Sequence, residues 1–90
     1  MPVGKVKRVV DGDTFVLAEG ERVRIANLDA PELSEKGGQA AKKRLQQVLP
    51  KGSASWLSKP LAKSYDRTVR KVTVKGKPIN KLLAKPPKHR

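Results

Sequence analysis

The chain has 90 residues, of which 21 are Lys or Arg and 8 are Asp or Glu, so its net charge is +13 and its pI is about 10.6. This length is enough for one domain with one modest hydrophobic core. The absence of cysteine excludes disulfides, thiolate metal sites and a cysteine nucleophile, and the short apolar runs exclude a membrane-spanning helix.

Three strands are predicted in the first third of the chain. Residues 3–10 form the first strand, and residues 14–17 and 22–25 form a hairpin around a tight turn at residues 19–21. Alternation along the second hairpin strand leaves the Arg24 side chain on the face away from the core.

The hairpin is expected to bring two acidic motifs together. The motif DGDT at residues 11–14 precedes the hairpin and the motif DAPE at residues 29–32 follows it, and they hold four of the 8 acidic residues. If the hairpin folds about its central glycine, positions whose numbers sum to about 40 lie opposite each other. Asp13 then faces Asn27 and lies close to Asp29, and an arginine beside paired carboxylates indicates a charged ligand.

Each of these features also has an ordinary explanation when it is taken alone. Asp11 followed by glycine is typical of a hairpin turn. Asp29 fits the N-cap of a helix, with Glu32 completing a capping box. Arg24 by itself fits a solvated strand residue. A binding site is favoured because all three occur at a spacing that one hairpin brings together.

A helix is predicted to begin at Gly37 and Gly38 and to end at Pro50. Its polar residues 42–44 lie mostly off the apolar stripe and are expected to face solvent or a ligand. The apolar residues that recur at helical spacing are Ala41, Leu45, Val48 and Leu49.

Two further strands are predicted after the helix. Residues 53–58 form the fourth strand, in which Trp56 is expected in the core or at its edge rather than on a base-stacking surface. Residues 59–67 form a loop, because Pro60 prevents regular pairing. Residues 68–74 form the fifth strand, with a bulge where the apolar positions change parity.

The end of the chain is predicted to turn at residues 75–78 and to form one helical turn at residues 80–84. Residues 1–84 are expected to form the domain, and residues 85–90 a disordered basic tail. The only histidine, His89, lies in that tail and is a poor catalytic candidate. Five strands with a helix between the third and fourth predict a mainly β fold of the OB-fold barrel class.

The positive charge predicts a polyanionic partner, most simply DNA or RNA. An acidic membrane surface is the alternative, but no apolar helical face rich in aromatics accompanies the charge. A small basic protein that docks on an acidic protein partner is a third hypothesis. The carboxylates, without cysteine or a usable histidine, favour a hard cation such as Ca²⁺ or Mg²⁺ over zinc.

Together these motifs resemble the staphylococcal-nuclease-like (thermonuclease) family over residues 3–83. The family pattern has DGDT, an arginine five residues before the Asp of a DAPE or DTPE motif, a helix opened by Gly and Ala, a Tyr-Gly-Arg motif and a late Asn. The matching residues are Asp11 to Thr14, Arg24, Asp29 to Glu32, Gly38, Ala40, Tyr65, Arg67 and Asn80.

The resemblance implies a five-stranded OB-fold barrel with a shortened C-terminal helical part, and it implies a bound cation. Asp13, Asp29 and the backbone carbonyl of Ala30 would bind Ca²⁺, which is preferred over Mg²⁺ by this likeness. Asp11 would support the metal loop from behind these ligands.

The activity implied is calcium-dependent hydrolysis of phosphodiester bonds in DNA or RNA with little sequence preference, leaving 3′-phosphate ends. Glu32 would act as general base, and Arg24 and Arg67 would bind the phosphate and stabilise its developing charge. Tyr65 would contact the nucleotide phosphate. The alternative is an OB-fold module that binds nucleic acid without cleaving it.

Three departures from the family pattern bear on activity. Asp66 stands where the family usually has Gly, and it adds a negative charge beside Arg67. Asn27 also replaces a usual Gly, but Asn tolerates a left-handed backbone. The chain stops soon after Leu83, where relatives continue into further helix. The N-terminus lacks the apolar segment of a signal peptide, so an intracellular location is expected.

Overall fold

The structure is a computed structural model that describes residues 3–28, 30, 33–63 and 66–83. Four of the predictions from sequence fall outside these ranges and stay predictions. They are the metal ligand Asp29, the general base Glu32, the phosphate contact Tyr65 and the tail at residues 85–90.

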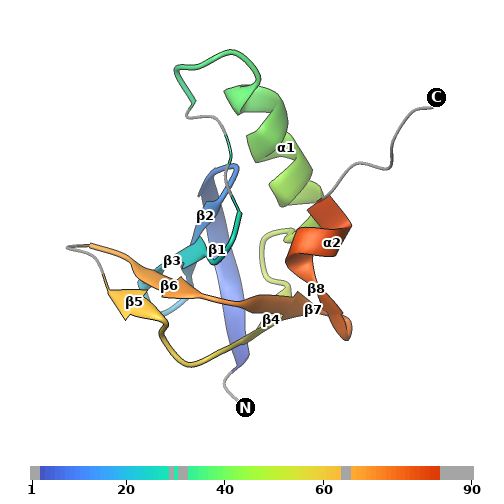
Figure 1. Cartoon of the computed structure of the whole chain (residues 1–90). Coiled ribbons are helices and arrows are strands. Elements are labelled where there is room, and N and C mark those ends of the chain that lie inside the picture. The colour runs from blue at the N-terminus through green and yellow to red at the C-terminus, as the bar shows by residue number, and fades with distance from the viewer. Residues whose placement is uncertain (1–2, 29, 31–32, 64–65, 84–90) are drawn as a thin grey trace.

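The described chain is mainly β, with two helices against one open and strongly curled sheet (Figure 1). The sheet order is β5-β6-β3-β2-β1-β4-β7-β8. The elements are β1 (Val3–Asp11), β2 (Thr14–Leu17), β3 (Arg22–Ile25), α1 (Gly38–Val48), β4 (Ala54–Leu57), β5 (Ala62–Lys63), β6 (Thr68–Arg70), β7 (Val72–Val74), β8 (Lys77–Pro78) and α2 (Ile79–Leu83). Neither helix in this part of the chain has the length and apolar character that crossing a membrane requires.

All five predicted strands are present, and two short ones were missed. β5 lies inside the predicted loop and pairs with β6, and β8 pairs with β7 across a two-residue turn. Both residues of that turn, Lys75 and Gly76, have positive φ (53° and 79°), which matches the right-handed twist of the flanking strands.

The curl of the sheet follows from the way one segment is shared between its two sides. β6 pairs in parallel with β3, whereas β7 pairs antiparallel with β4, and only Lys71 separates them. Because β3 and β4 are three places apart in the sheet order, one short segment can join both only if the sheet bends back on itself. The predicted bulge in residues 68–74 is therefore a break at Lys71.

The register of the first hairpin differs from the predicted one by two residues. Thr14 pairs with Arg24, so opposite positions sum to 38 rather than about 40, and the Ile25 N–H donates to the Asp13 carbonyl at 2.8 Å. The turn closes earlier than its central glycine suggests, since the Leu17 N–H donates to the Glu21 carbonyl at 2.9 Å. A shift of two preserves the strand faces, so Arg24 still lies off the core.

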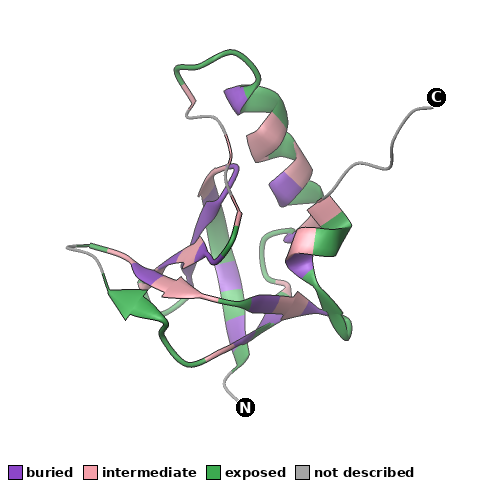
Figure 2. Ribbon diagram, in the orientation of Figure 1, coloured by how far each residue is buried: buried purple, intermediate pink, exposed green. Residues whose placement is uncertain are grey.

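The core lies between the inner face of the curled sheet and the two helices (Figure 2). Leu45 and Leu49 are buried, as the apolar stripe of the helix predicts, and Val48 packs beside them. Among the described residues, those with 0% exposure are Phe15, Val23, Ile25, Leu45, Ser55 and Ile79.

Two predictions about side-chain exposure are wrong. Trp56 is 45% exposed, because Ser55 and Leu57 take the inward positions of β4. Arg44 is only partly exposed. Its Nη2 donates to the Leu83 carbonyl at the end of α2, so this guanidinium contacts the protein as well as solvent. A guanidinium at this position satisfies a helix-terminal carbonyl that has no partner within the helix.

A half-buried ion pair holds the point where β6 passes into β7. Arg70 Nε lies 2.8 Å from Glu21 Oε2, and Arg70 Nη1 donates to the Ser58 carbonyl at 2.7 Å. Ser58 in turn accepts the Lys71 N–H through its hydroxyl at 2.8 Å. One guanidinium thus ties the hairpin turn to the end of β4.

We expect Arg70→Ala to lower the free energy of unfolding by about 1.5–3 kcal/mol, the usual range for a hydrogen bond to a charged group. The loss arises because Glu21 and the Ser58 carbonyl would each lack their partner. Urea unfolding followed by circular dichroism measures it, with Lys77→Ala as an exposed strand control. Equal stability of Arg70→Ala and the control would contradict this role.

Candidate functional site

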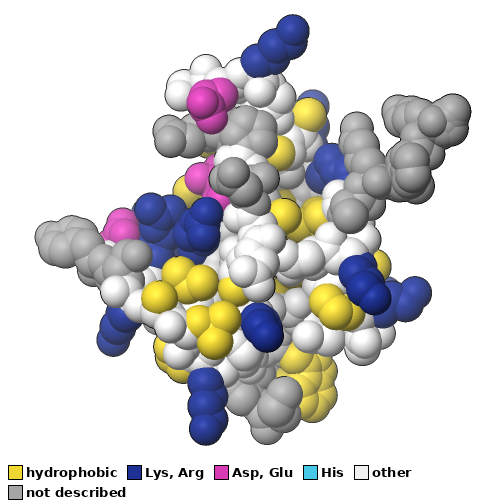
Figure 3. All heavy atoms as spheres, viewed as in Figure 1, with side chains coloured by type: hydrophobic (Ala, Val, Ile, Leu, Met, Phe, Trp, Pro, Cys, Tyr) yellow, Lys and Arg dark blue, Asp and Glu magenta, His cyan; other side chains and the backbone are white. Residues whose placement is uncertain are grey.

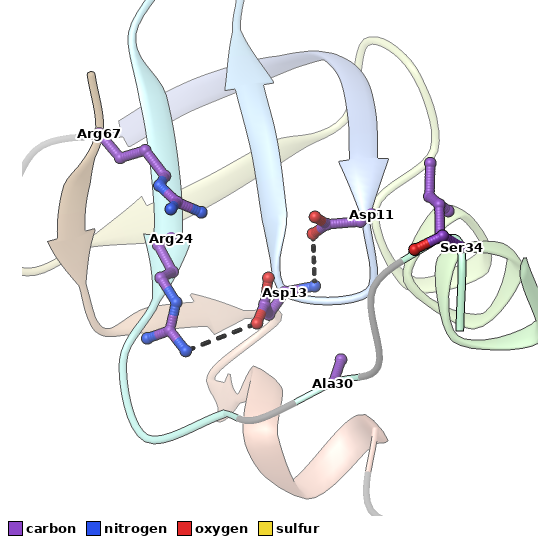
Figure 4. A pocket seen from close by; sticks show the side chains of 7 residues that line it. Asp11, Asp13, Arg24, Ala30, Ser34 and Arg67 are labelled. Atoms are coloured by element: carbon purple, nitrogen blue, oxygen red, sulfur yellow. Dashed lines mark hydrogen bonds and ion pairs between the residues drawn. The ribbon is translucent and has the colours of Figure 1, made fainter. Parts of the chain in front are cut away.

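An open cleft of about 640 Å³ lies beside the β1–β2 turn. Of the described residues, seven line the cleft, and five of these were predicted from sequence as site residues. The described lining residues are Asp11, Asp13, Arg24, Ala30, Leu33, Ser34 and Arg67. Leu33 and Ser34 were not predicted, and their position directly after the second acidic motif is the only sequence signal for them. Figure 4 shows the two arginines on one side, with the carboxylates between them and Ala30.

The acidic turn is held in shape by its own backbone and by close packing. The Asp13 N–H donates to Asp11 Oδ1 at 3.2 Å, so the Asp11 carboxylate is occupied in supporting the turn. A Cβ at Gly12 would lie 2.7 Å from the Cβ atoms of Ala30 and Ala41, which is too close. Glycine therefore allows the turn to sit between helix α1 and the segment that carries Ala30.

Asp13 is the buried acid of the cleft. Its Oδ1 accepts the Thr14 hydroxyl at 3.0 Å, and its Oδ2 lies 3.6 Å from Arg24 Nη2. Burial raises the pKa of the Asp13 carboxyl, and neighbouring Asp11 adds to the rise, which Thr14 and Arg24 only partly oppose. The surroundings of Asp13 thus stabilise its ionised form less well than water does.

The two cleft arginines differ in how firmly they are held. Arg24 Nη2 reaches both Asp13 and, at 3.4 Å, the Leu28 carbonyl, so this side chain spans the cleft and the segment that leads to the second motif. Arg67 is 40% exposed, and its described ion pair is a long one of 3.7 Å to Asp66. Arg67 is therefore the more available guanidinium.

Asn80 connects helix α2 to the segment before the second acidic motif. Its Nδ2 donates to the carbonyls of Ala26 and Asn27, both at 3.0 Å. Asn27 has a φ of 60°, which confirms the left-handed backbone expected where Asn replaces Gly. The late Asn of the sequence pattern thus positions backbone and does not line the cleft.

The described residues do not form a metal site by themselves. Within residues 3–28, 30, 33–63 and 66–83, no group of three or more His, Cys, Asp or Glu is placed to hold an ion. Asp11 and Asp13 are the described acids of the cleft. Asp29, Glu32 and Tyr65, which sequence reasoning assigned to this site, lie outside the described residues.

Comparison of the sequence with protein-family models found no match, and a search among curated proteins found no similar sequence.

We expect Asp13→Asn to raise the melting temperature at pH 7 in the absence of divalent cations. The raised pKa of Asp13 means that the folded state favours the protonated acid, so the ionised carboxylate destabilises the fold at neutral pH. The advantage of Asn should disappear as the pH falls below the ordinary value of 3.8, where the acid is protonated in both states.

Differential scanning calorimetry measures the melting temperatures of variant and wild type between about pH 3 and pH 7, in steps of about one pH unit. Asp66→Asn removes an acid whose side chain is 55% exposed and is the matched control, with no expected change. A lower melting temperature for Asp13→Asn at neutral pH would show that the Arg24 and Thr14 contacts outweigh the cost of burial.

Proposed function

We propose that this protein is a calcium-dependent nuclease of low sequence specificity, built on an OB-fold barrel of the staphylococcal-nuclease-like type. The observation that carries the proposal is the cleft, where Asp11, Asp13, Arg24 and Arg67 converge from separate segments of the chain. The carboxylates of this cleft can bind a cation, and the neighbouring guanidinium groups can bind the phosphate of a phosphodiester.

The strand pairing supports the fold part of the proposal. β1 pairs with both β2 and β4, and residues 68–74 pair with β3 at one end and with β4 at the other. This pairing in an open, curled sheet, with a helix between β3 and β4, supports the small, partly open barrel of an OB-fold that we propose. β5 and β8 extend its two edges.

The donor set of the cleft fits a hard cation. Asp13 offers a buried carboxylate whose charge is only partly balanced, and the other described donors are oxygens rather than sulfur or imidazole. Asp13, Asp29 and the Ala30 carbonyl would hold Ca²⁺, with Asp11 holding the turn. The bound ion would supply positive charge that polarises the scissile phosphate and neutralises the acids.

The side chains have distinct roles in the proposed hydrolysis. Arg67, the more available guanidinium, would bind a non-bridging phosphate oxygen, and Arg24 would leave its long contact with Asp13 to bind a second. Both would stabilise the charge that grows on these oxygens as water attacks phosphorus. Glu32 would take the proton from that water, Tyr65 would contact a phosphate of the substrate, and cleavage on the 5′-oxygen side would leave a 3′-phosphate.

A barrel that binds DNA or RNA without cleaving it is the second candidate. The ion pair between Arg67 and Asp66 favours it, because this acid competes with a phosphate for the guanidinium. The two candidates share the basic surface and the fold, so only cleavage separates them.

We expect the purified protein to cleave single-stranded DNA and RNA with Ca²⁺, to cleave poorly with Mg²⁺ and to be inactive with chelator. Asp13→Ala should abolish activity, and Arg67→Ala or Arg24→Ala should lower the turnover about 10²- to 10³-fold, as for loss of one charge-stabilising donor. Glu32→Ala should lower it about 10²- to 10⁴-fold. Gel analysis of end-labelled strands, with mapping of the 3′ ends, measures both rate and product.

Arg22→Ala is the matched control, because Arg22 lies two residues from Arg24 on the same strand and does not line the described cleft. It should keep its turnover. Binding of the strand without cleavage under any of these conditions would reject the nuclease and leave the binding barrel.

We expect Asp66→Asn to lower the KM for single-stranded DNA by roughly twofold to fivefold, the scale of one exposed ion pair. The substitution frees Arg67 from its 3.7 Å contact and removes a negative charge beside the bound phosphate. Steady-state kinetics at two salt concentrations measures it, since the gain should shrink at high salt. A higher KM would mean that Asp66 aims Arg67 at the substrate.

A further inference from the structure

Trp56 is a large apolar side chain that the cleft does not use. It is the only tryptophan in the chain and is 45% exposed. Burial of so large an apolar side chain would stabilise the fold, so this exposure gives up part of that stabilisation. The alternation of β4 turns Ser55 and Leu57 inward and leaves Trp56 on the outer face of the sheet. Trp56 lies on a strand that is paired on both sides and its side chain is open to solvent, so the ring can contact a ligand.

Trp56 belongs to a row of residues across four strands, which we name the outer row. Trp56 pairs with Val3 of β1 and with Thr73 of β7, and Thr73 pairs with Pro78 of β8. Directly paired residues project to the same face of a sheet, so these four side chains lie side by side over about 14 Å. Val3 is 52% exposed and Pro78 is exposed as well.

Lysines flank the outer row. Lys5 lies two residues from Val3 on the same face of β1, and Lys71 lies two residues before Thr73, and both are exposed. Residues 3–10, 53–58 and 71–83, which include the strands β1, β4, β7 and β8 of this side of the sheet, contain no Asp or Glu. The Glu21 carboxylate that approaches Ser58 is already paired with Arg70.

The acidic residues are concentrated in the first part of the sequence and the basic residues in the rest. Residues 1–35 contain 5 Lys or Arg and 7 Asp or Glu, whereas residues 36–90 contain 16 and 1. Figure 3 shows the acidic side chains of one face gathered at its upper left, with lysines and arginines around the rest. The outer row thus combines an exposed aromatic ring with two exposed lysines beside it.

We propose that Trp56 stacks against a base of single-stranded nucleic acid whose phosphates contact Lys5 and Lys71. Base stacking on an aromatic ring tolerates any sequence, and flanking lysines track the backbone. A second copy of the chain is a poor occupant, because each copy carries a charge of +13. The inference rests on the proposed function in its choice of nucleic acid and adds a second contact to it.

The outer row lies far from the cleft. Val3 begins β1 and Asp11 ends it, so the two are about 25 Å apart along the strand. A single-stranded nucleic acid that is bound at both places would run along the length of β1. Trp56 would then hold the substrate without touching the reacting phosphate.

The test is a titration of the whole protein, in chelator, with an oligothymidylate of about 12 nucleotides, which is within the site size of single OB-folds. Because Trp56 is the only tryptophan, its emission reports directly on stacking. We expect the emission to be quenched on binding. An abasic strand with the same number of phosphates should bind more weakly and leave the emission nearly unchanged.

Variants separate stacking from charge. Trp56→Ala should weaken binding of the labelled oligothymidylate roughly 5- to 150-fold in fluorescence anisotropy without changing its salt dependence, and Trp56→Phe should weaken it less. Lys5→Ala should reduce the slope of log K against log salt by about 0.7. Leu61→Ala removes another exposed apolar side chain, 55% exposed and outside the outer row, and should bind as the wild type does.

Each result decides between named alternatives. Unchanged affinity of Trp56→Ala, with a melting temperature equal to that of the wild type, would overturn the proposal, as would equal binding of the abasic strand. Concentration-dependent dimerisation in sedimentation that Trp56→Ala abolishes would assign the outer row to a second copy. Quenching that persists in an Arg67→Ala variant, or in a protein without cleavage activity, would support Trp56 stacking even if the nuclease proposal fails.

Discussion

The structure depends on one segment, residues 68–74, that pairs with both sides of the sheet. Its first half lies parallel to β3 and its second half antiparallel to β4, which forces the sheet to curl. The parallel register sets Thr68 beside Val23, so the preceding Arg67 arrives next to the strand that carries Arg24. The same segment leads through β8 into α2, whose Asn80 holds the backbone before the second acidic motif. The segment that curls the sheet is therefore also the one that places Arg67 and Asn80 beside the strands and backbone of the cleft region.

Within the cleft, the arrangement of charge opposes stability and favours binding. The Asp13 carboxylate is buried beside Asp11, and its contact with Arg24 is long. An ionised acid in this position destabilises the folded chain. The cation that we propose for the cleft would offset this cost when it binds. Gly12 maintains the arrangement, since any side chain there would push the turn away from Ala41.

The two proposals assign two kinds of contact with a polyanion to separate parts of the surface. The cleft offers directional groups, because Arg24 and Arg67 present planar guanidinium groups beside acids. The side of the sheet that carries Trp56 offers lysines and an aromatic ring, which hold a chain without selecting its sequence. Both properties agree with a protein that acts on nucleic acid in general rather than on one site.

The sequence alone predicted the features that depend on local rules. Alternation identified the longer strands, and helical spacing identified the stripe around Leu45. The two acidic motifs, together with Arg24 and Arg67 of the same family pattern, identified most of the described cleft residues. Register, exposure and ionisation depended on neighbours distant in the chain. The turn between Leu17 and Glu21 sets a register two residues away from the expected one. Trp56 is exposed although its strand lies inside the sheet, because a strand has two faces and only tertiary packing decides which face is covered. The raised pKa of Asp13 likewise follows from burial, which no spacing of residues encodes.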